Sequence, residues 1–193
     1  MLEQLVQFDH QVFKAINTGL SNSFFDWLMP LLRNRYLWVP LYLFLIIFLI
    51  RNYKKSGAIC IVFLLITFGI SDYFSASIIK PAVERLRPCN EPGFNADVIM
   101  RVNCGSGFSF PSSHAANHFA IAMFLSIIFG KRWKWVWPVS FLWAFSIILA
   151  QMYVGVHFPV DVTFGALLGC LIGYITSTIF LTLQPNKKWN SGL

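Results

Sequence analysis

The apolar stretch GAICIVFLLITFGISDYFSASII, residues 57–79, decides the fold of this chain. It is long enough to cross a lipid bilayer, because a membrane helix needs roughly 17 to 25 predominantly apolar residues. Its one charged residue is Asp72, and it ends directly at Lys80. We predict that this stretch is a membrane-spanning helix.

The rest of the chain has the same apolar character. Of its 193 residues, 56% are hydrophobic and only 12% are charged, whereas soluble domains carry about 25% charged residues. Five stretches are candidates to span the bilayer: residues 36–50, 57–79, 113–129, 135–154 and 162–183. The composition therefore predicts an all-α integral membrane protein, a bundle of about five transmembrane helices.

The segment before the first span has helical periodicity of its own. Apolar residues recur at helical spacing over residues 2–16 and again over residues 23–32, which predicts amphipathic helices lying along the membrane interface. Packing against the bundle is an equally good interpretation. Glu3 and Asp9 interrupt the first of these helices, so it does not read as a cleaved signal peptide. We expect one domain over residues 1–193, with an interfacial segment at 1–34 and a transmembrane core at 36–184.

The charges sort the loops into two sides. One side carries short basic loops without acidic residues: Arg51, Lys54, Lys55, Lys131, Arg132, Lys134, Lys187 and Lys188. The positive-inside rule makes this side cytoplasmic, so the segment 81–110 and the turn around His157 face outward. We expect a multi-pass protein of the inner (cytoplasmic) membrane whose outward face meets the periplasm or the exterior. The net charge of +7 then reflects loops near anionic lipid and not a nucleic-acid surface.

Four cysteines divide in the same way. Cys60 and Cys170 lie within spans, whereas Cys89 and Cys104 lie in the outward segment. An exported compartment is oxidising, so these two are candidates for a disulfide that closes a loop of about 15 residues and stabilises by roughly 3 kcal/mol. Two free thiols are the alternative.

Two polar clusters on the outward side suit a phosphate group. Lys80 offers a point charge and Arg87, fixed by Pro88, offers a planar fork for two oxygens. Pro111-Ser112-Ser113-His114 opens the third span, where the free amides of a helix start bind anions. His114 there is a candidate general acid, and His118, one turn deeper, a supporting residue.

A third cluster supplies a nucleophile. His157 and Asp161 are four residues apart, so on one helical face the carboxylate could accept a hydrogen bond from the imidazole. That contact would leave the other ring nitrogen free to attack phosphorus.

Together these clusters resemble the type 2 phosphatidic acid phosphatase superfamily, whose motifs are KxxxxxxRP, PSGH and SRxxxxxHxxxD. The matching positions are Lys80, Arg87 and Pro88 in the first motif, Pro111, Ser112 and His114 in the second, and His157 and Asp161 in the third. The departures are Ser113 in place of glycine, and Ala150-Gln151 in place of the serine-arginine pair.

The resemblance implies a metal-independent, cofactor-free membrane lipid phosphatase. His157 would form a phosphohistidine, Asp161 would orient it, and His114 would protonate the leaving group. The phosphate would be held by Lys80, Arg87, Ser112, Ser113 and Gln151. Size and the five-span plan look most like the small bacterial undecaprenyl-diphosphate phosphatases; phosphatidylglycerophosphate, phosphatidic acid and lipid A phosphates are the other substrates of the family.

Gln151 keeps a second interpretation open, because it lacks the charge that the family's arginine brings to the phosphate. Arg85 and Arg101 are candidates to replace that charge, and Gln151→Arg is then expected to keep or raise activity. The alternative is a catalytically weakened lipid-binding or carrier protein. A transporter with Asp72 as a relay is a third possibility. The simpler interpretation is that Asp72 is a partner of Lys80 or a polar residue near the pocket floor.

Overall fold

The computed structural model describes residues 2–184 and Trp189; the predicted cytoplasmic Lys187 and Lys188 lie outside them. The helices are α1 (Leu2–Asn17), α2 (Ser23–Arg33), α3 (Val39–Asp72), α4 (Lys80–Val83), α5 (Ser113–Phe129), α6 (Val136–Tyr153) and α7 (Pro159–Leu183). A π-helical segment, Tyr73–Ile79, joins α3 to α4, and 3-10 turns cover Arg35–Trp38, Pro88–Asn90 and Asn95–Asp97. The described part of the chain has no strand, and the predicted all-α membrane bundle is confirmed.

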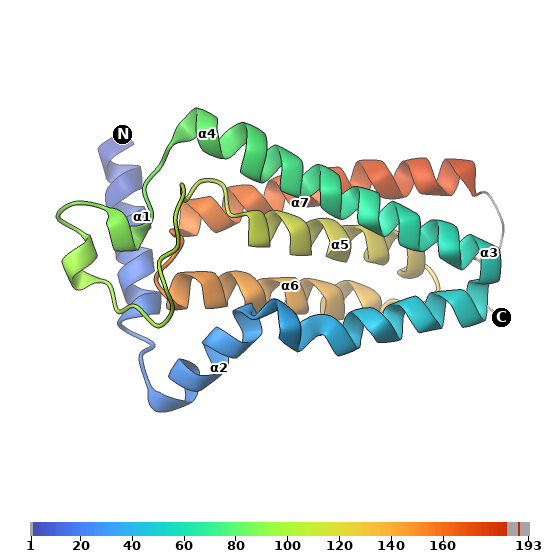
Figure 1. The fold of residues 1–193 in the computed structure, drawn as a ribbon, viewed down its shortest axis with the longest axis horizontal. Coiled ribbons are helices and arrows are strands. Elements are labelled where there is room, and N and C mark those ends of the chain that lie inside the picture. Colours follow the sequence, from blue (N-terminus) through green and yellow to red (C-terminus); the bar gives the residue numbers. More distant parts are fainter. Residues whose placement is uncertain (1, 185–188, 190–193) are drawn as a thin grey trace.

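Helix α3 contains two of the predicted spans. The chain reverses direction at Lys54, whose backbone is non-helical (φ 51°, ψ −123°), so that two limbs run in opposite directions and diverge from the turn (Figure 1). Just past the turn, a Cβ on Gly57 would lie 2.0 Å from the carbonyl oxygen of Leu49, so only glycine permits this close reversal. The first limb begins at Val39, later than expected, because a 3-10 turn precedes it.

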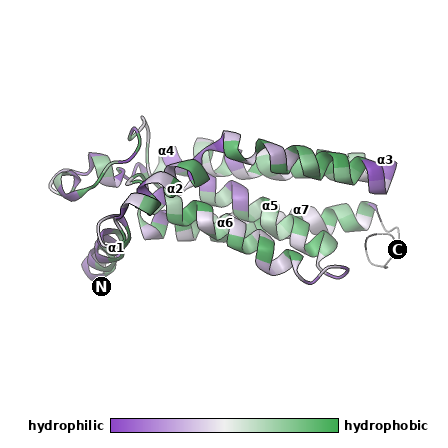
Figure 2. Ribbon diagram, turned by 90° about the horizontal axis from the view of Figure 1, so that it is seen from below, coloured by the Kyte–Doolittle hydropathy of each residue, from purple (hydrophilic) through white to green (hydrophobic). Residues whose placement is uncertain are grey.

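Five apolar helical segments therefore form the bundle: the two limbs of α3, together with α5, α6 and α7. By length and composition, the Arg35–Asn90 stretch, α6 and α7 can cross a membrane, and the apolar α5 is shorter. Figure 2 shows these helical segments as mainly hydrophobic, whereas α1 and the loop before α5 carry more hydrophilic residues.

The closest helix pair is α5 with α7. Three glycines spaced by four residues, Gly165, Gly169 and Gly173, face the backbone of α5. A Cβ at these positions would lie 2.5, 2.2 and 2.3 Å from the carbonyl oxygens of Ser112, Ala116 and Ala120, respectively. Small residues let membrane helices approach this closely, and the pairing fixes the start of α5 against the start of α7.

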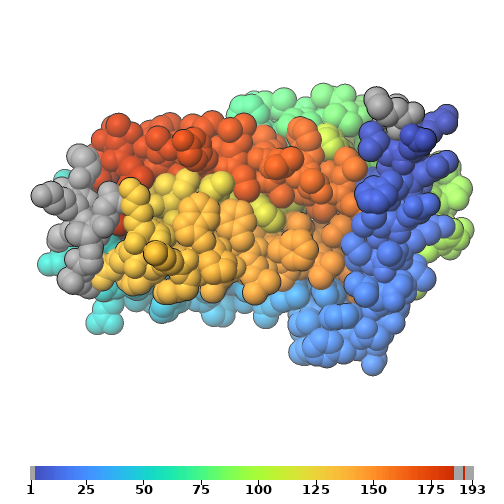
Figure 3. Space-filling model, turned by 180° about the vertical axis from the view of Figure 1, so that it is seen from behind, coloured from blue at the N-terminus to red at the C-terminus, as the bar shows by residue number. Residues whose placement is uncertain are grey.

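Helix α1 packs across the ends of α6 and α7 (Figure 3). Asp9, Phe13 and Asn17, spaced by four residues, are buried there, whereas Leu5 and Phe8 are 58% and 64% exposed. A mixed polar face thus packs on the bundle, as the second interpretation of this helix expected. The exposed apolar residues suit contact with the membrane interface, as the first interpretation of this helix expected.

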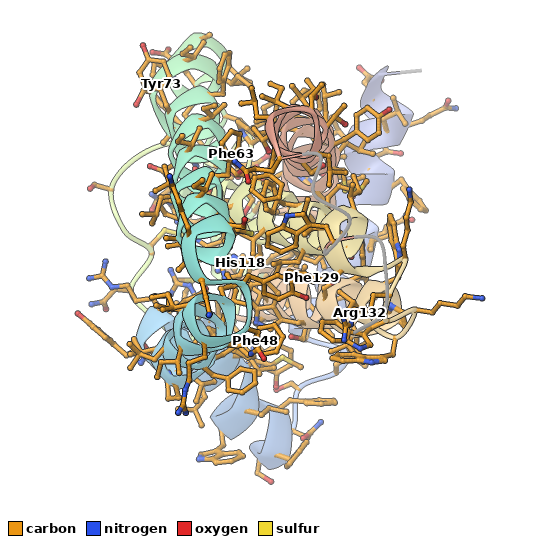
Figure 4. All side chains as sticks on the ribbon, turned by 90° about the vertical axis from the view of Figure 1, so that its right-hand side faces the viewer. Phe48, Phe63, Tyr73, His118, Phe129 and Arg132 are labelled. Carbon is orange, nitrogen blue, oxygen red and sulfur yellow. A yellow bond between two sulfur atoms is a disulfide. The ribbon has the colours of Figure 1, made fainter. Side chains whose placement is uncertain are left out.

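Aromatic side chains close the opposite end of the bundle. Figure 4 looks onto that end, where Phe48 and Phe129 pack edge to face with ring centroids 6.4 Å apart. The turn between the two limbs of α3 and the loop between α5 and α6 lie at this end, away from α1 and the loop before α5 (Figure 1). The turn contains Lys54, and the loop contains Arg132. The loops that the charge pattern assigned to the two sides of the membrane therefore lie at opposite ends of the molecule.

Candidate active site

His157 lies in the link between α6 and α7, directly before α7 begins at Pro159. The expected placement of His157 and Asp161 on one helical face is thus wrong, because only Asp161 belongs to the helix. The two side chains still meet, with 3.6 Å between His157 Nδ1 and Asp161 Oδ2. This separation is longer than a hydrogen bond.

The environment of His157 keeps its imidazole neutral. The side chain is only 3% exposed, and burial lowers the pKa of His157 to about 4, although the Asp161 carboxylate acts in the opposite direction. A neutral ring has a free lone pair on one nitrogen at pH 7, which a nucleophile requires.

Asp161 is held by a network that reaches α1. The fully buried carboxylate accepts hydrogen bonds from Arg85 Nη1 at 2.8 Å, from the Ser109 hydroxyl and from the backbone N–H of Phe158 at 2.8 Å. Arg85 Nη2 also donates to Asp9 at 2.5 Å, and Asp9 accepts from the backbone N–H of Val160 at 2.8 Å. Asp161 is therefore fixed from several sides before any substrate binds.

Lys80 and Arg87 both border the loop that leads into α5. Lys80 Nζ donates to the carbonyl oxygen of Phe108 at 2.8 Å, and Arg87 Nε donates to that of Gly107 at 3.1 Å. Their described partners are thus carbonyl groups and not carboxylates, which leaves both positive charges available to an anion.

A disulfide holds the same loop. Cys89 and Cys104 are bonded, with 6.1 Å between their Cα atoms. The bond closes the segment between α4 and α5 just after Arg87 and just before Gly107.

The first turn of α5 differs from its expected form at one residue. The Ser112 hydroxyl caps the helix by accepting from Ala115 N–H at 3.4 Å, and the backbone N–H of Ser112 donates to the carbonyl oxygen of Asp161 at 3.0 Å. This amide is not free for a phosphate, contrary to our expectation. The buried Ser113 hydroxyl has no hydrogen-bond partner among residues 2–184 and Trp189, so it remains a donor.

His114 occupies the same turn, close enough to His157 and Lys80 to interact electrostatically with both. His118 Nδ1 donates a hydrogen bond to the His114 carbonyl oxygen at 2.8 Å, and its ring packs on Trp143 with centroids 5.0 Å apart. This geometry supports the auxiliary role predicted for His118.

Asp72 accepts a hydrogen bond from Asn117 at 2.9 Å and lines an apolar cavity, which fits its predicted place near the pocket floor. It also attracts Lys80 electrostatically, although Lys80 Nζ donates its hydrogen bonds to loop carbonyls. The expectation for Arg85 is wrong. Arg85 binds Asp9 and Asp161, so it is not a free cation beside Gln151.

Arg101 likewise has other partners: it forms an ion pair with Asp26 and donates a hydrogen bond to the carbonyl oxygen of Tyr153. The guanidinium that reaches Gln151 is that of Arg33, whose Nε donates to Gln151 Oε1 at 3.2 Å. No pattern in the local sequence links these two residues, which are 118 positions apart.

An apolar cavity of about 570 Å³ opens beside these residues. Arg33, Ser113 and His114 line its polar end, and it extends between the limbs of α3 and α5 to Leu49 and Ile61. A second cavity of about 330 Å³ shares Tyr42 and Leu45 with it and is lined almost wholly by apolar side chains. Within the described ranges 2–184 and 189, no group of three or more His, Cys, Asp or Glu residues is placed to hold a metal ion.

The comparisons with known proteins fit this site. Residues 57–185 match the model of the family described as the PAP2 superfamily, a range that includes all three motif clusters. The chain belongs to the PAP2 superfamily. It is accordingly a membrane phosphatase, built on the all-helical fold described above.

Several PAP2 relatives align with nearly the whole chain. A lipid A 4'-phosphatase from Bacteroides thetaiotaomicron is 36% identical over 91% of this chain and 78% of its own length. A lipid A 4'-phosphatase from Porphyromonas gingivalis is 29% identical over 97% and 78%. An undecaprenyl-diphosphatase from Sulfolobus acidocaldarius is 28% identical over 96% and 84%.

Two solved PAP2-type structures resemble the fold. LpxE from Aquifex aeolicus has a TM-score of 0.60 and 27% identity, over 87% of this chain and 93% of its own. A phosphatidylglycerolphosphate phosphatase from Bacillus subtilis has a TM-score of 0.73 over 93% and 88%. At 21% identity, the latter supports the fold alone.

Proposed function

We propose that this protein removes a phosphate group from a membrane lipid at the end of the bundle where α1 lies. The observation that carries the proposal is one juxtaposition. The buried His157, beside the fixed carboxylate of Asp161, interacts electrostatically with the cations Lys80 and Arg87 and with His114, and His114 lines the polar end of a long apolar cavity.

The chemistry follows from the positions of three side chains. The free ring nitrogen of His157 attacks phosphorus, the bond to the leaving oxygen breaks, and His114 donates a proton to that oxygen. His114 then takes a proton from water, whose oxygen attacks the phosphohistidine and releases inorganic phosphate. Asp161 stabilises the cationic ring of the intermediate.

The non-bridging phosphate oxygens would be bound by Lys80, by Arg87 and by the hydroxyl of Ser113, which lies at the start of α5. Gln151 would contribute a neutral hydrogen bond. Ser112 acts differently from the initial expectation, because its hydroxyl caps α5 and its amide binds the Asp161 carbonyl. We assign it the positioning of α5.

The apolar cavity supports a lipid as the substrate. Leu45, Leu64 and Phe68 are among the side chains that continue it inward from His114. A hydrocarbon chain placed there would leave its phosphate at the polar end. A soluble phosphoester would gain nothing from such a lining.

Lipid A bearing a 4'-phosphate is the first substrate to test, since the Bacteroides thetaiotaomicron relative of that name is 36% identical over most of both chains. From sequence alone undecaprenyl diphosphate was favoured, and it remains the second candidate. The Sulfolobus acidocaldarius undecaprenyl-diphosphatase, which aligns with 96% of this chain, supports it.

We also propose that the site faces the periplasm or the exterior. The turn within α3 and the loop between α5 and α6 lie at the opposite end. They carry Lys54, Lys131 and Arg132, and the positive-inside rule assigns such basic loops to the cytoplasm.

The test is phosphate release by the detergent-purified protein with EDTA present. The substrates are lipid A, undecaprenyl diphosphate, phosphatidylglycerophosphate and phosphatidic acid, and a His157→Ala variant of equal thermal stability is measured beside it. We expect release from lipid A that is insensitive to EDTA and absent in the variant. Release that persists in His157→Ala would exclude the proposed nucleophile. No release from any lipid by folded protein would favour the lipid-binding or carrier alternative.

A further inference from the structure

Arg33 enters the active site from outside all three motif clusters. It is the last residue of α2, and α2 packs on α6 through Met29, which is buried against Ala150 and Tyr153. This packing places the α2 terminus beside the residue that follows Ala150. Arg33 therefore reaches Gln151 because two helices pack, and not because of a local sequence motif.

The contact with Gln151 defines the orientation of both side chains. A guanidinium only donates hydrogen bonds, so the glutamine must turn its oxygen toward Arg33, as the 3.2 Å distance from Nε to Oε1 shows. Gln151 is fully buried, and its Nε2 has no hydrogen-bond partner in the described part of the chain. The amide thus holds Arg33 with one end and leaves a donor at the other.

The charge on Arg33 has no acidic partner among the described residues. Arg85 and Arg101, by contrast, each form ion pairs with buried or nearby carboxylates. Burial and the neighbouring Arg87 guanidinium lower the pKa of Arg33, which shows that the two cations approach each other. An arginine keeps its proton in such a setting, so the site accumulates positive charge that an anion would balance.

The position of Arg33 is also the right one for a substrate contact. Arg33 lines the 570 Å³ cavity together with Ser113 and His114. It therefore borders the space in which the phosphate and the leaving oxygen of a lipid would lie.

We propose that Arg33, oriented by Gln151, is a phosphate-binding residue of this active site, and that it supplies from α2 the cation that position 151 lacks. The inference rests on the proposed phosphatase function and adds a residue to it. It explains how the site accommodates glutamine at 151 without losing a positive charge.

This assignment reverses the expectation for Gln151→Arg. An arginine at 151 would place a second guanidinium against Arg33 and remove the oxygen that holds it. The single substitution is therefore expected to lower activity, whereas exchanging the two residues, Arg33→Gln with Gln151→Arg, keeps one cation and one amide in the site.

The test compares wild type, Arg33→Gln, the exchange variant and Arg51→Gln. The last is a matched control, because Arg51 is exposed at the opposite end of the bundle. Because a charge-assisted hydrogen bond contributes roughly 1.5–3 kcal/mol, we expect Arg33→Gln to lower kcat/KM on the lipid about 10- to 100-fold. The exchange variant should recover to within about fivefold of wild type, and Arg51→Gln should match wild type.

A second measurement does not need turnover. Titration of each purified variant with inorganic phosphate and with orthovanadate should show at least a tenfold weaker Kd for Arg33→Gln and recovery in the exchange variant. If wild type binds phosphate but releases none from any lipid, the proposed function fails while Arg33 is still decided by the titration. Arg33→Gln within twofold of wild type in both measurements would overturn the inference, as would an exchange variant no better than Arg33→Gln.

Discussion

The two sides of the helix bundle are built differently. On one side, α5 and α7 approach until their backbones touch, with Gly169 against Ala116. On the other side, the limbs of α3 leave a cavity of about 570 Å³ against α5. The tight side fixes Ser112 at the start of α5 against Asp161 in the first turn of α7, whereas the open side leaves space between helices, so close packing and access belong to separate helix pairs.

The largest effect should come from the tight side, at Asp161. Asp161→Asn keeps the shape of the side chain but weakens the interactions with Arg85 and with the His157 ring. Loss of such a carboxylate is expected to lower kcat by about 10³- to 10⁴-fold, on a lipid and on p-nitrophenyl phosphate alike. Steady-state kinetics on both substrates measure it, with the exposed Asp97→Asn as control. A loss of less than tenfold would mean that the carboxylate does not support the histidine.

Replacing one glycine by alanine on each side of the bundle tests the difference between the two sides directly. In Gly169→Ala the new methyl group would meet the Ala116 carbonyl oxygen at 2.2 Å, whereas at the exposed Gly69 of α3 a Cβ meets nothing within 4 Å. Overpacking destabilises by about 1–3 kcal/mol, and replacing an unstrained helical glycine by alanine stabilises by roughly 0.5–1 kcal/mol. Thermal unfolding in detergent should show opposite shifts in Tm, and equal shifts would contradict the difference between the sides.

The spans and the site were predictable to different degrees. Span 113–129 coincides with α5 because apolar composition bounded by polar turns sets its ends. The last span was placed at residues 162–183, but α7 starts at Pro159, since proline is well tolerated in the first turn of a helix. The motif residues assembled at one end because their places at span termini already required it.

The contacts that complete the site were not predictable. Arg85 binds both Asp9 and Asp161, and each of these partners is 76 positions away from it in the sequence. Arg33 contacts Gln151, which is 118 positions away. Arg85, Arg101 and Arg33 are alike as sequence symbols. Only the folded chain shows that the first two bind carboxylates, while the third has no carboxylate partner in the part of the chain that the structure describes.

A smaller effect is expected from filling the open side. Leu64→Trp adds bulk to the cavity lining and should raise KM for a long-chain lipid about tenfold, because hydrocarbon burial contributes about 0.8 kcal/mol per CH₂ group. Turnover of p-nitrophenyl phosphate should be unchanged. Leu142→Trp, on an exposed surface of α6, is the control. Equal losses on both substrates would show that the cavity does not bind the lipid chain.

The smallest change should be the response of activity to mild acid, because His157 lies on the tight, dry side. An ordinary histidine of pKa about 6.5 would be only about 3% neutral at pH 5. Since burial lowers the pKa of His157 to about 4, its neutral form should persist, and kcat/KM should fall by less than about threefold between pH 7 and 5. A fall of about 25-fold over this range, as expected for an ordinary histidine, with protein still folded, would contradict the burial of the ring.

The same pKa shift acts on stability. Between pH 6.5 and 4 the unfolded chain binds a proton at His157 that the folded chain does not. This group therefore makes the free energy of unfolding fall as the pH decreases through that range. Urea unfolding at pH 7 and pH 5 measures the slope.

The position of α1 has a consequence for biosynthesis. The Asp9 carboxylate binds the backbone of Val160, 151 positions later. A ribosome adds about 5–20 residues per second, so the first helix waits roughly 10–30 s before its partner exists. During that interval Arg85 has Asp9 but not Asp161, and the nascent chain carries an incomplete centre. The last helix to enter the membrane is therefore the one that makes the enzyme active, and translation acts as its timer.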